Sequence, residues 1–496
     1  MISQLLEQAR IYEKNAERRI SENERPAFHL SARTGWLNDP NGFSYFGGMY
    51  HLYYQYYPYA SHWDSMHWGH AASRDLLHWE YLPAALAPDM FYDEDGVYSG
   101  SSIDIPDGRR ILMYTGVKKV QGPDHKLKEK QTQCIAVGDG VDFEKYVDNP
   151  VLTENHLPAG ASGFEFRDPK LVRLPDGRFG CYVASLDKVG GGQILFYSSE
   201  DAFHWKYEGV IARNEGRFGR MWECPDFFEL NGKWVLLTSP QDMLPGGFEY
   251  NSGNGTLCLI GSLEEGMKFK EERNQAIDYG IDFYAPQTVL APDGRRIMIG
   301  WMQNWDACAI REPESAWAGQ ISLPRELSLK EGRLYQKPLS EFNSLRENRV
   351  QHRDVRFSGH LSLDGVSGRI VDIELYIRPG DDNDLFEKFQ IRFAQDEKYY
   401  TLLQFRPREG ILKIDREFSG SRRAIVHQRK CFVGENTREL KIRIILDRYS
   451  VEVFANEGRQ VMTSTIYTAP HADGISFFAD GSVLMDVVKY DIRREV

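Results

Sequence analysis

The sequence predicts an all-β protein in which a five-bladed β-propeller is followed by a C-terminal β-sandwich. Two observations lead to this prediction. A glycine-led turn that enters an apolar strand recurs at Gly48, Gly108, Gly177, Gly232 and Gly294. Beyond these repeats, strands of alternating apolar and polar residues continue toward the end of the chain. Five successive units of short strands fit the blades of a propeller, and period-two strands fit two facing sheets.

The repeat supports one circular domain over residues 28–337. Its five glycines lie 60, 69, 55 and 62 residues apart. A second echo is the similarity of residues 73–79 (SRDLLHW) to residues 199–205 (SEDAFHW). Hairpins with Asp-Gly or Asn-Gly occur in any β protein, but a common position in five successive units makes coincidence the weaker explanation.

The segments outside the propeller have their own patterns. Residues 1–27 are expected to be helical, because helical spacing relates the apolar residues Ile2, Leu5, Leu6, Ala9 and Tyr12. Residues 338–352 form a polar, helix-like connector. Residues 353–496 carry strands such as 370–377 and 440–446, whose alternation predicts the sandwich. A structural prop is the favoured role of this module, with sugar binding as the alternative.

Composition limits the class of partner. The 496 residues carry a net charge of −12, which argues against nucleic acid, and residues 1–19 are too charged for a signal peptide. No apolar run is long enough to span a bilayer. The six cysteines are scattered, without the spacing of a zinc site or a disulfide framework. We therefore expect a cytoplasmic protein with free thiols, without a metal, cofactor or membrane partner; a homo-oligomer is left open.

Three acidic residues stand in similar surroundings, each preceded by an aromatic residue and closely followed by proline. They are found in Trp36-Leu37-Asn38-Asp39-Pro40-Asn41-Gly42, Phe166-Arg167-Asp168-Pro169 and Met221-Trp222-Glu223-Cys224-Pro225. The Asn, Asp, Pro and Gly around Asp39 predict a backbone bend just ahead of a strand. One such acid is usually a turn residue or a helix cap. Three of them suggest a carboxylate-based hydrolase.

Glycosidic cleavage needs a proton donor and, in a retaining enzyme, a nucleophile about 5–5.5 Å from it. The two groups must differ in pKa, one being ionised and the other held protonated. Neighbouring asparagines favour an ionised Asp39, and Arg167 favours an anionic Asp168. Glu223, between Trp222 and Cys224, has the drier setting expected of an acid. In a propeller these residues fall in the first, third and fourth units, so inner strands could bring them to one axial pocket.

These three stretches resemble, in order, the acidic signatures of glycoside hydrolase family 32, which includes invertases, sucrose-6-phosphate hydrolases and fructan hydrolases. The resemblance runs from Phe28 nearly to the C-terminus. Further matching segments are residues 54–56, 67–70, 98–101, 282–287, 300–302 and 447–458. One such motif is weak, but all of them in order are specific.

The resemblance implies a propeller plus sandwich and a retaining β-fructofuranosidase. By it, Asp39 is the nucleophile, Glu223 the acid/base and Asp168 the transition-state stabiliser. The residues expected to line the substrate pocket are Trp36, Asn38, Gln55, Trp63, Tyr98, Ser99, Arg167 and Tyr284. Two departures concern the outer pocket: Asp64-Ser65 replaces the usual glycine after Trp63, and Tyr98 stands where Trp or Phe is commoner.

Several alternatives remain at this point. The substrate could be sucrose, sucrose 6-phosphate or a short fructo-oligosaccharide. A fructosyltransferase, a non-catalytic carbohydrate-binding propeller and an inverting arabinan-type hydrolase with more widely separated acids are the competing functions. Cys224 as a nucleophile and a metal site at His67 and His70 are weaker interpretations than packing, because neither has the partner residues that such sites need.

Overall fold

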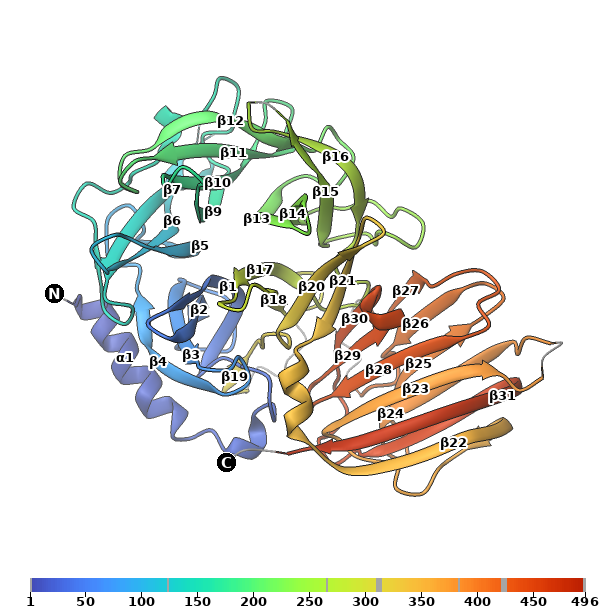
Figure 1. Ribbon diagram of the computed structural model, residues 1–496. Helices are drawn as coiled ribbons and strands as arrows, with labels where there is room; N and C mark the ends of the chain where they lie inside the picture. Colours follow the sequence, from blue (N-terminus) through green and yellow to red (C-terminus); the bar gives the residue numbers. More distant parts are fainter. Residues whose placement is uncertain are drawn as a thin grey trace.

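The fold is built almost entirely from strands. The computed structural model describes residues 2–122, 125–264, 266–308, 315–381, 384–420 and 426–493. Five small sheets stand around one axis, and a large sheet packs against the side of this ring (Figure 1). The predicted fold class, a five-bladed propeller followed by a sandwich-like β domain, is therefore confirmed.

Each blade is an antiparallel sheet whose strands follow one another along the chain. The first blade contains β1 (Gly35–Phe46), β2 (Met49–Tyr57), β3 (His67–Ser73) and β4 (Trp79–Leu86). The second contains β5 (Gly96–Asp104), β6 (Arg110–Gln121), β7 (Leu127–Gly138) and β8 (Phe143–Lys145). The third contains β9 (Phe166–Arg173), β10 (Phe179–Leu186), β11 (Gly192–Ser199) and β12 (Lys206–Arg213).

The last two blades complete the ring. The fourth contains β13 (Trp222–Leu230), β14 (Lys233–Pro240), β15 (Leu257–Glu264) and β16 (Lys268–Gln275). The fifth contains β17 (Tyr284–Leu290), β18 (Arg296–Trp301), β20 (Arg325–Lys330) and β21 (Arg333–Pro338). The short β19 (Trp317–Ala318) pairs in parallel with β1. The first strands of the blades, β1, β5, β9, β13 and β17, contact one another in a ring around the axis.

The glycine repeat marks the same turn in every blade. Each recurring glycine lies between the first and second strands, with a φ angle between +76° and +89°. This left-handed backbone conformation is one that glycine adopts without a steric cost. The repeat seen in the sequence is therefore the turn that leads away from the innermost strand.

Each innermost strand carries an extra residue relative to its neighbour, which is a β-bulge, and β1 has a second one between Asn41 and Ser44. In β1, Asn38 and Asp39 lie opposite the single residue Gln55. Equivalent register shifts occur near Ser99 in β5, Asp168 in β9, Cys224 in β13 and Ala285 in β17. A bulged residue is free of the regular ladder, so its side chain can be aimed differently.

These bulges differ from the bend predicted at Asp39 and account for prolines in the inner strands. The bend predicted just ahead of a strand at Asp39 is a bulge inside β1 instead. Three of the bulges contain a proline, namely Pro169, Pro225 and Pro286. Proline has no N–H for the ladder and is tolerated within sheets at bulges. The prolines that follow Asp168 and Glu223 therefore mark bulged inner strands, whereas Pro40 lies just beyond the bulge of β1 and pairs with Tyr54.

The C-terminal part is one hydrogen-bonded sheet of ten strands that folds over its own apolar core. Its strands are β22 (Arg346–Leu361), β23 (Val371–Pro379), β24 (Lys388–Gln395), β25 (Thr401–Arg406), β26 (Ile411–Asp415), β27 (Gln428–Phe432), β28 (Leu440–Leu446), β29 (Ser450–Ala455), β30 (Gln460–Thr465) and β31 (Gly474–Ile492). The long β31 pairs with β24 in its first part and with β23 in its second. This strand joins the two layers of the sandwich.

Short helices occupy the segments between and before these sheets. The N-terminal helix α1 (Gln4–Glu17) begins at the N-cap Ser3 and packs on β4, where it buries Leu6 and Ala9. In the described ranges, the 3₁₀ helices are η1 (Glu22–Glu24), η2 (Glu154–His156), η4 (Ser340–Leu345) and η5 (Asn456–Gly458). Because β22 begins at Arg346, the C-terminal sheet starts within residues 338–352, the expected linker. Across the described ranges, no helix combines the length and the apolar character needed to cross a bilayer.

A buried network of charged side chains joins the N-terminal segment, the propeller and the C-terminal sheet. His29 Nδ1 lies 2.8 Å from Asp447 Oδ2, and His29 Nε2 lies 3.0 Å from Glu452 Oε1. Arg325 of β20 pairs with the same Glu452 and, at 3.0 Å, with Asp278. Burial lowers the pKa of His29, but hydrogen bonds to the two carboxylates outweigh it and raise the pKa to about 9.

This network makes the stability of the fold depend on pH. The folded-state pKa of His29 lies above its ordinary value of 6.5, so its contribution is fully present below pH 6.5 and is lost as pH rises through 9. The shift corresponds to about 3 kcal/mol. We expect His29→Gln to remove this part of the pH dependence, measured by urea unfolding at pH 6.5 and pH 9. The exposed His471 provides a control in His471→Gln. The expectation would be contradicted if the free energy of unfolding changed between pH 6.5 and pH 9 by the same amount in the wild type and in His29→Gln.

Candidate active site

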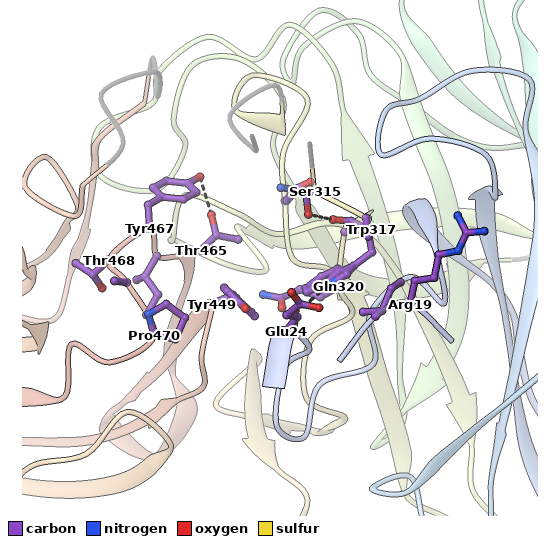
Figure 2. A pocket seen from close by; sticks show the side chains of 16 residues that line it. Arg19, Glu24, Ser315, Trp317, Gln320, Tyr449, Thr465, Tyr467, Thr468 and Pro470 are labelled. Atoms are coloured by element: carbon purple, nitrogen blue, oxygen red, sulfur yellow. Dashed lines mark hydrogen bonds between the residues drawn. The ribbon is translucent and has the colours of Figure 1, made fainter. Parts of the chain in front are cut away.

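The three acids predicted from the sequence lie at one cavity of about 970 Å³. Asp39, Asp168 and Glu223 come from β1, β9 and β13, and each lies at the bulge of its strand. A second cavity, of about 470 Å³, lies between the propeller and the C-terminal sheet (Figure 2). Glu24 is the one carboxylate among the described residues that line this second cavity. The cluster of acids therefore makes the first cavity the candidate active site.

Asp39 is held on one side only. Its Oδ2 accepts a hydrogen bond of 2.7 Å from the Ser99 hydroxyl and a weak one of 3.6 Å from the Cys224 thiol. Its Oδ1 is buried and has no hydrogen-bond partner among the described residues. Burial raises the pKa of Asp39 to about 6; the hydrogen bond from Ser99 opposes this rise, and the charge of Glu223 adds to it. The carboxylate is thus ionised at neutral pH and retains an unsatisfied oxygen.

Asp168 occupies a constrained backbone position. Its φ of +61° is left-handed, and its amide donates a 2.9 Å hydrogen bond to Thr115 Oγ1. Its Oδ2 accepts a hydrogen bond of 2.9 Å from the backbone N–H of Cys224. Burial raises the pKa of Asp168, the neighbouring Arg167 lowers it and the charge of Glu223 raises it further. The bulges of β9 and β13 therefore hold this carboxylate between them.

Glu223 is fixed by a separate donor on each carboxylate oxygen. Arg167 Nε lies 3.1 Å from Oε1, and the Tyr284 hydroxyl donates a 2.7 Å hydrogen bond to Oε2. Arg167 also pairs with Glu165 and donates to Gln131 at 3.2 Å. Two donors from different blades define the orientation of this carboxyl group.

Cys224 lies between the carboxylates of Asp39 and Asp168. Its thiol is 3.6 Å from the first and 3.7 Å from the second. Burial, together with the charges of these two acids, raises its pKa well above the ordinary value. A thiol that stays protonated is a weak hydrogen-bond donor and not a nucleophile. Its single S–H therefore has the two carboxylates as alternative acceptors.

The remaining predicted residues divide into two groups. Residues that line the cavity are Asn38, Gln55, Trp63, Tyr98, Ser99 and Arg167. Trp36 and Tyr284 are buried behind its wall and act through neighbours: Trp36 Nε1 donates to Asn38 Oδ1 at 2.8 Å, and Tyr284 donates to Glu223. The indole of Trp63 is 41% exposed and meets the Tyr98 ring edge-on at 5.8 Å. The Tyr98 hydroxyl in turn donates to Glu129 at 2.9 Å.

Several lining residues are absent from the sequence prediction. They are Lys128, Glu129, Gln131, Ser162, Phe164, Glu165, Leu186, Arg220, Gln241, Asp242, Asn254 and Trp305. Glu165 stands three residues before Asp168 and could have been found from that motif. Glu129 and Gln131 come from β7, in the middle of the second blade, and nothing in their local sequence marks them. Glu129 reaches Tyr98 within the same blade, whereas the contact of Gln131 with Arg167 joins the second blade to the third.

The histidines that were considered as metal ligands pack inside the first blade. Burial lowers the pKa of both His67 and His70, and His70 Nε2 lies 3.0 Å from His51 Nδ1. Across the part of the chain that the structure describes, no three His, Cys, Asp or Glu side chains are grouped to hold a metal ion.

Comparisons with known proteins give a consistent result. The model of the glycosyl hydrolases family 32 N-terminal domain matches residues 29–338, and that of the family 32 C-terminal domain matches residues 341–493. A raffinose invertase from Escherichia coli is 36% identical over 464 residues, and a sucrose-6-phosphate hydrolase from Escherichia coli is 35% identical over 468 residues. Each match covers 92% of this chain and 92% of the relative.

Solved structures resemble the whole chain. A mutant of a Bombyx mori GH32 beta-fructofuranosidase in complex with sucrose has a TM-score of 0.83 at 32% identity and covers 100% of this chain and 99% of its own. A sucrose-6-phosphate hydrolase from Lactobacillus gasseri has a TM-score of 0.83 at 28% identity and covers 100% and 97%.

The burial of Cys224 leads to a test by thiol labelling. Cys308 is partly exposed, whereas the other five cysteines are buried. We expect iodoacetamide at pH 8 to modify Cys308 first in the folded protein and the others only after unfolding in urea, as followed by peptide mass spectrometry. The Cys308→Ser variant should show almost no labelling before unfolding. Rapid alkylation of Cys224 in the folded protein would contradict its buried position and its raised pKa.

Proposed function

This chain belongs to glycosyl hydrolase family 32, and from that premise we propose that it is a retaining β-fructofuranosidase that hydrolyses sucrose or sucrose 6-phosphate. The observation that carries the proposal is the convergence of Asp39, Asp168 and Glu223 on one cavity. A glycosidase that retains configuration needs a nucleophile and an acid/base on opposite sides of the scissile bond.

We assign the nucleophile to Asp39. Attack on the anomeric carbon of the fructosyl group needs an ionised carboxylate with an oxygen that is not already saturated by donors. Asp39 has its pKa near 6, and its Oδ1 lacks a partner among the described residues. Ser99 and Cys224 hold the other oxygen and so fix the direction of the carboxylate. The bond formed to the sugar would be an ester, which water then hydrolyses.

We assign the acid/base to Glu223. In the first step it gives a proton to the glycosidic oxygen, and in the second it takes a proton from the attacking water. Arg167 and Tyr284 hold its two oxygens, which supports a carboxyl group kept in one orientation through both steps. Asp168 then serves as the stabiliser, because it is a second buried carboxylate that can accept hydrogen bonds from sugar hydroxyls while positive charge develops on the ring.

The leaving group contacts the outer part of the cavity in this proposal. Trp63 offers an exposed indole face, and Tyr98 with Glu129 forms the adjoining wall. Relatives are named raffinose invertase and sucrose-6-phosphate hydrolase, a levanase from Bacillus subtilis is 33% identical over 491 residues, and the similar Bombyx mori structure is a complex with sucrose. The ratio of kcat/KM for sucrose, sucrose 6-phosphate and kestose measures the preference among these substrates.

The proposed site of action is the cytoplasm. All six cysteines are free, which suits a reducing compartment, and relatives named as sucrose-6-phosphate hydrolases act on a phosphorylated sugar. Fractionation of cells with an antibody against the protein tests this part of the proposal, and size-exclusion chromatography with light scattering gives the number of subunits.

The assignment of the acids is tested by substitution. We expect Asp39→Ala and Glu223→Ala each to reduce kcat for sucrose by at least about 10²–10⁴-fold, the contribution of a positioned acid or base, without a change in circular dichroism. Asp107→Ala, which removes an exposed acid in the turn between β5 and β6, serves as the control. NMR of the first-formed fructose should show the β anomer. Near-normal sucrose cleavage by Asp39→Ala would refute the assignment.

The raised pKa of Asp39 predicts the acid limb of the pH profile. Protonation removes the nucleophile, so kcat/KM should fall about tenfold per pH unit as pH decreases below 6. The hydrogen bond from Ser99 lowers the pKa of Asp39, and its loss in Ser99→Ala should move the limb to higher pH. The measurement is kcat/KM for sucrose between pH 4 and 8. A limb that does not move in Ser99→Ala would contradict the link between these two residues.

A further inference from the structure

We propose that Asp282 and Arg416, which join the propeller to the C-terminal sheet, are positioning residues that act on Glu223 through Tyr284. This inference rests on the proposed function, because it takes Glu223 as the acid/base. It assigns the C-terminal sheet a part in the reaction although no residue of that sheet lines the active-site cavity among those the structure describes. The path runs from Arg416 through Asp282 and Tyr284 to Glu223.

Asp282 belongs to the propeller but is bound by the C-terminal sheet. Its side chain is buried, and its Oδ2 accepts hydrogen bonds of 2.5 Å from Arg416 Nη1, 2.7 Å from Thr465 N and 2.8 Å from Thr465 Oγ1. All three donors come from the C-terminal part of the chain. Removing one partner of a buried ion pair leaves a charge without compensation, so this contact strongly favours one position of Asp282.

Arg416 is anchored in the C-terminal sheet by its other contacts. It is fully buried, directly after β26. Its guanidinium donates to the carbonyl oxygens of Thr465 at 3.1 Å and Val426 at 3.2 Å and lies 5.0 Å from the centre of the Tyr467 ring. Figure 2 shows the bond between Thr465 and Tyr467 in the wall of the cavity between the two domains. Arg416 is thus a fixed point from which Asp282 is held.

The backbone before Tyr284 is also tied to this sheet. Tyr279 N donates to the carbonyl oxygen of Val461 at 2.8 Å, and the amides of Ile281 and Asp282 donate to that of Thr463 at 2.8 and 3.0 Å. Residues 279–282 therefore run beside β30 as an added strand-like segment. The Asp282 ion pair closes this segment two residues before Tyr284, at the point where the chain enters β17.

Tyr284 links the segment held by Asp282 to the active site. Its hydroxyl donates to Glu223 Oε2 at 2.7 Å and lies 3.0 Å from the carbonyl oxygen of Ser239. The next residue, Ala285, is the bulged one, with a φ of +50° and an amide that donates to Ser239 Oγ at 2.9 Å. Tyr284 is thus fixed by Asp282 on one side and by the bulge on the other. A shift of the segment would move the hydroxyl away from Glu223.

The expected consequence is specific to proton transfer. Misplacement of a catalytic group by about 1 Å can cost 10²-fold in rate. In the first step, a misplaced acid slows departure of glucose from sucrose, because the glycosidic oxygen needs a proton, but it hardly affects a p-nitrophenolate group, which leaves without one. A contact that only stabilises the fold would affect the reactions of these two leaving groups equally.

The test compares sucrose with p-nitrophenyl β-D-fructofuranoside in the full-length protein. We expect Asp282→Asn and Arg416→Lys to lower kcat/KM for sucrose, which reports the first step, between about 10- and 100-fold and kcat/KM for the aryl fructoside less than about 3-fold. Tyr284→Phe should show the same pattern. Asp372→Asn is the matched control, because Asp372 is a buried acid of the C-terminal sheet that pairs with Arg346 and Arg443.

Stability and catalysis are separated by measuring Tm for every variant and assaying each one well below its own transition. Equal losses of kcat/KM on the two substrates, or loss of Tm without a change in either kcat/KM, would overturn the positioning role while leaving the proposed function intact. Glu223→Gln is the reference for a damaged acid/base. If it also fails to distinguish the two leaving groups, the proposed function is wrong and this inference falls with it.

Discussion

The structure depends on one constraint: each innermost strand has an extra residue at the level of the cavity. In a regular strand, successive side chains alternate between the two faces of the blade. The bulges at Asp39, Ser99, Asp168, Cys224 and Ala285 interrupt this alternation. They let acids from separate blades approach a common cavity while the rest of each strand keeps its pairing. Because the bulge recurs in all five blades, side chains from separate blades meet at one site.

The cost of this arrangement is a cluster of like charges in a buried place. Burial raises the pKa of Asp39 and of Asp168, and the charge of Glu223 raises both further. Arg167 supplies the compensating charge, whereas the Cys224 thiol and the Ser99 hydroxyl supply neutral donors. Neutral donors stabilise a carboxylate without fixing it as strongly as an arginine does. The cluster is therefore held in one cavity by one charged donor and two neutral ones.

The sequence predicted the acids and the blades because both leave local marks. Glycine in the first turn of each blade and proline after each acid are consequences of backbone geometry, so they are visible without knowledge of the fold. The contact of Tyr284 with Glu223 joins residues 61 positions apart and follows only from the closed ring. Likewise, Asp480-Gly481 has the composition of a hairpin turn, yet β31 continues through it, because β22 pairs with β31 both before and after this dipeptide.

The same distinction explains why the role of the C-terminal sheet could not be derived from its pattern. Alternating strands predict an apolar core, and that core is present, but its residues do not reach the active-site cavity. Besides apolar contacts and backbone hydrogen bonds, buried charges connect the sheet to the propeller: His29 between Asp447 and Glu452, and Arg416 with Asp282. Buried ion pairs are weak evidence for stability, because an apolar contact of the same size often stabilises as well. Here the buried ion pairs matter because they restrict the position of the backbone. A guanidinium and a carboxylate fix the position of a backbone segment more narrowly than an apolar contact does, and the segment fixed by Asp282 is the one that leads into Tyr284 and the bulge of β17.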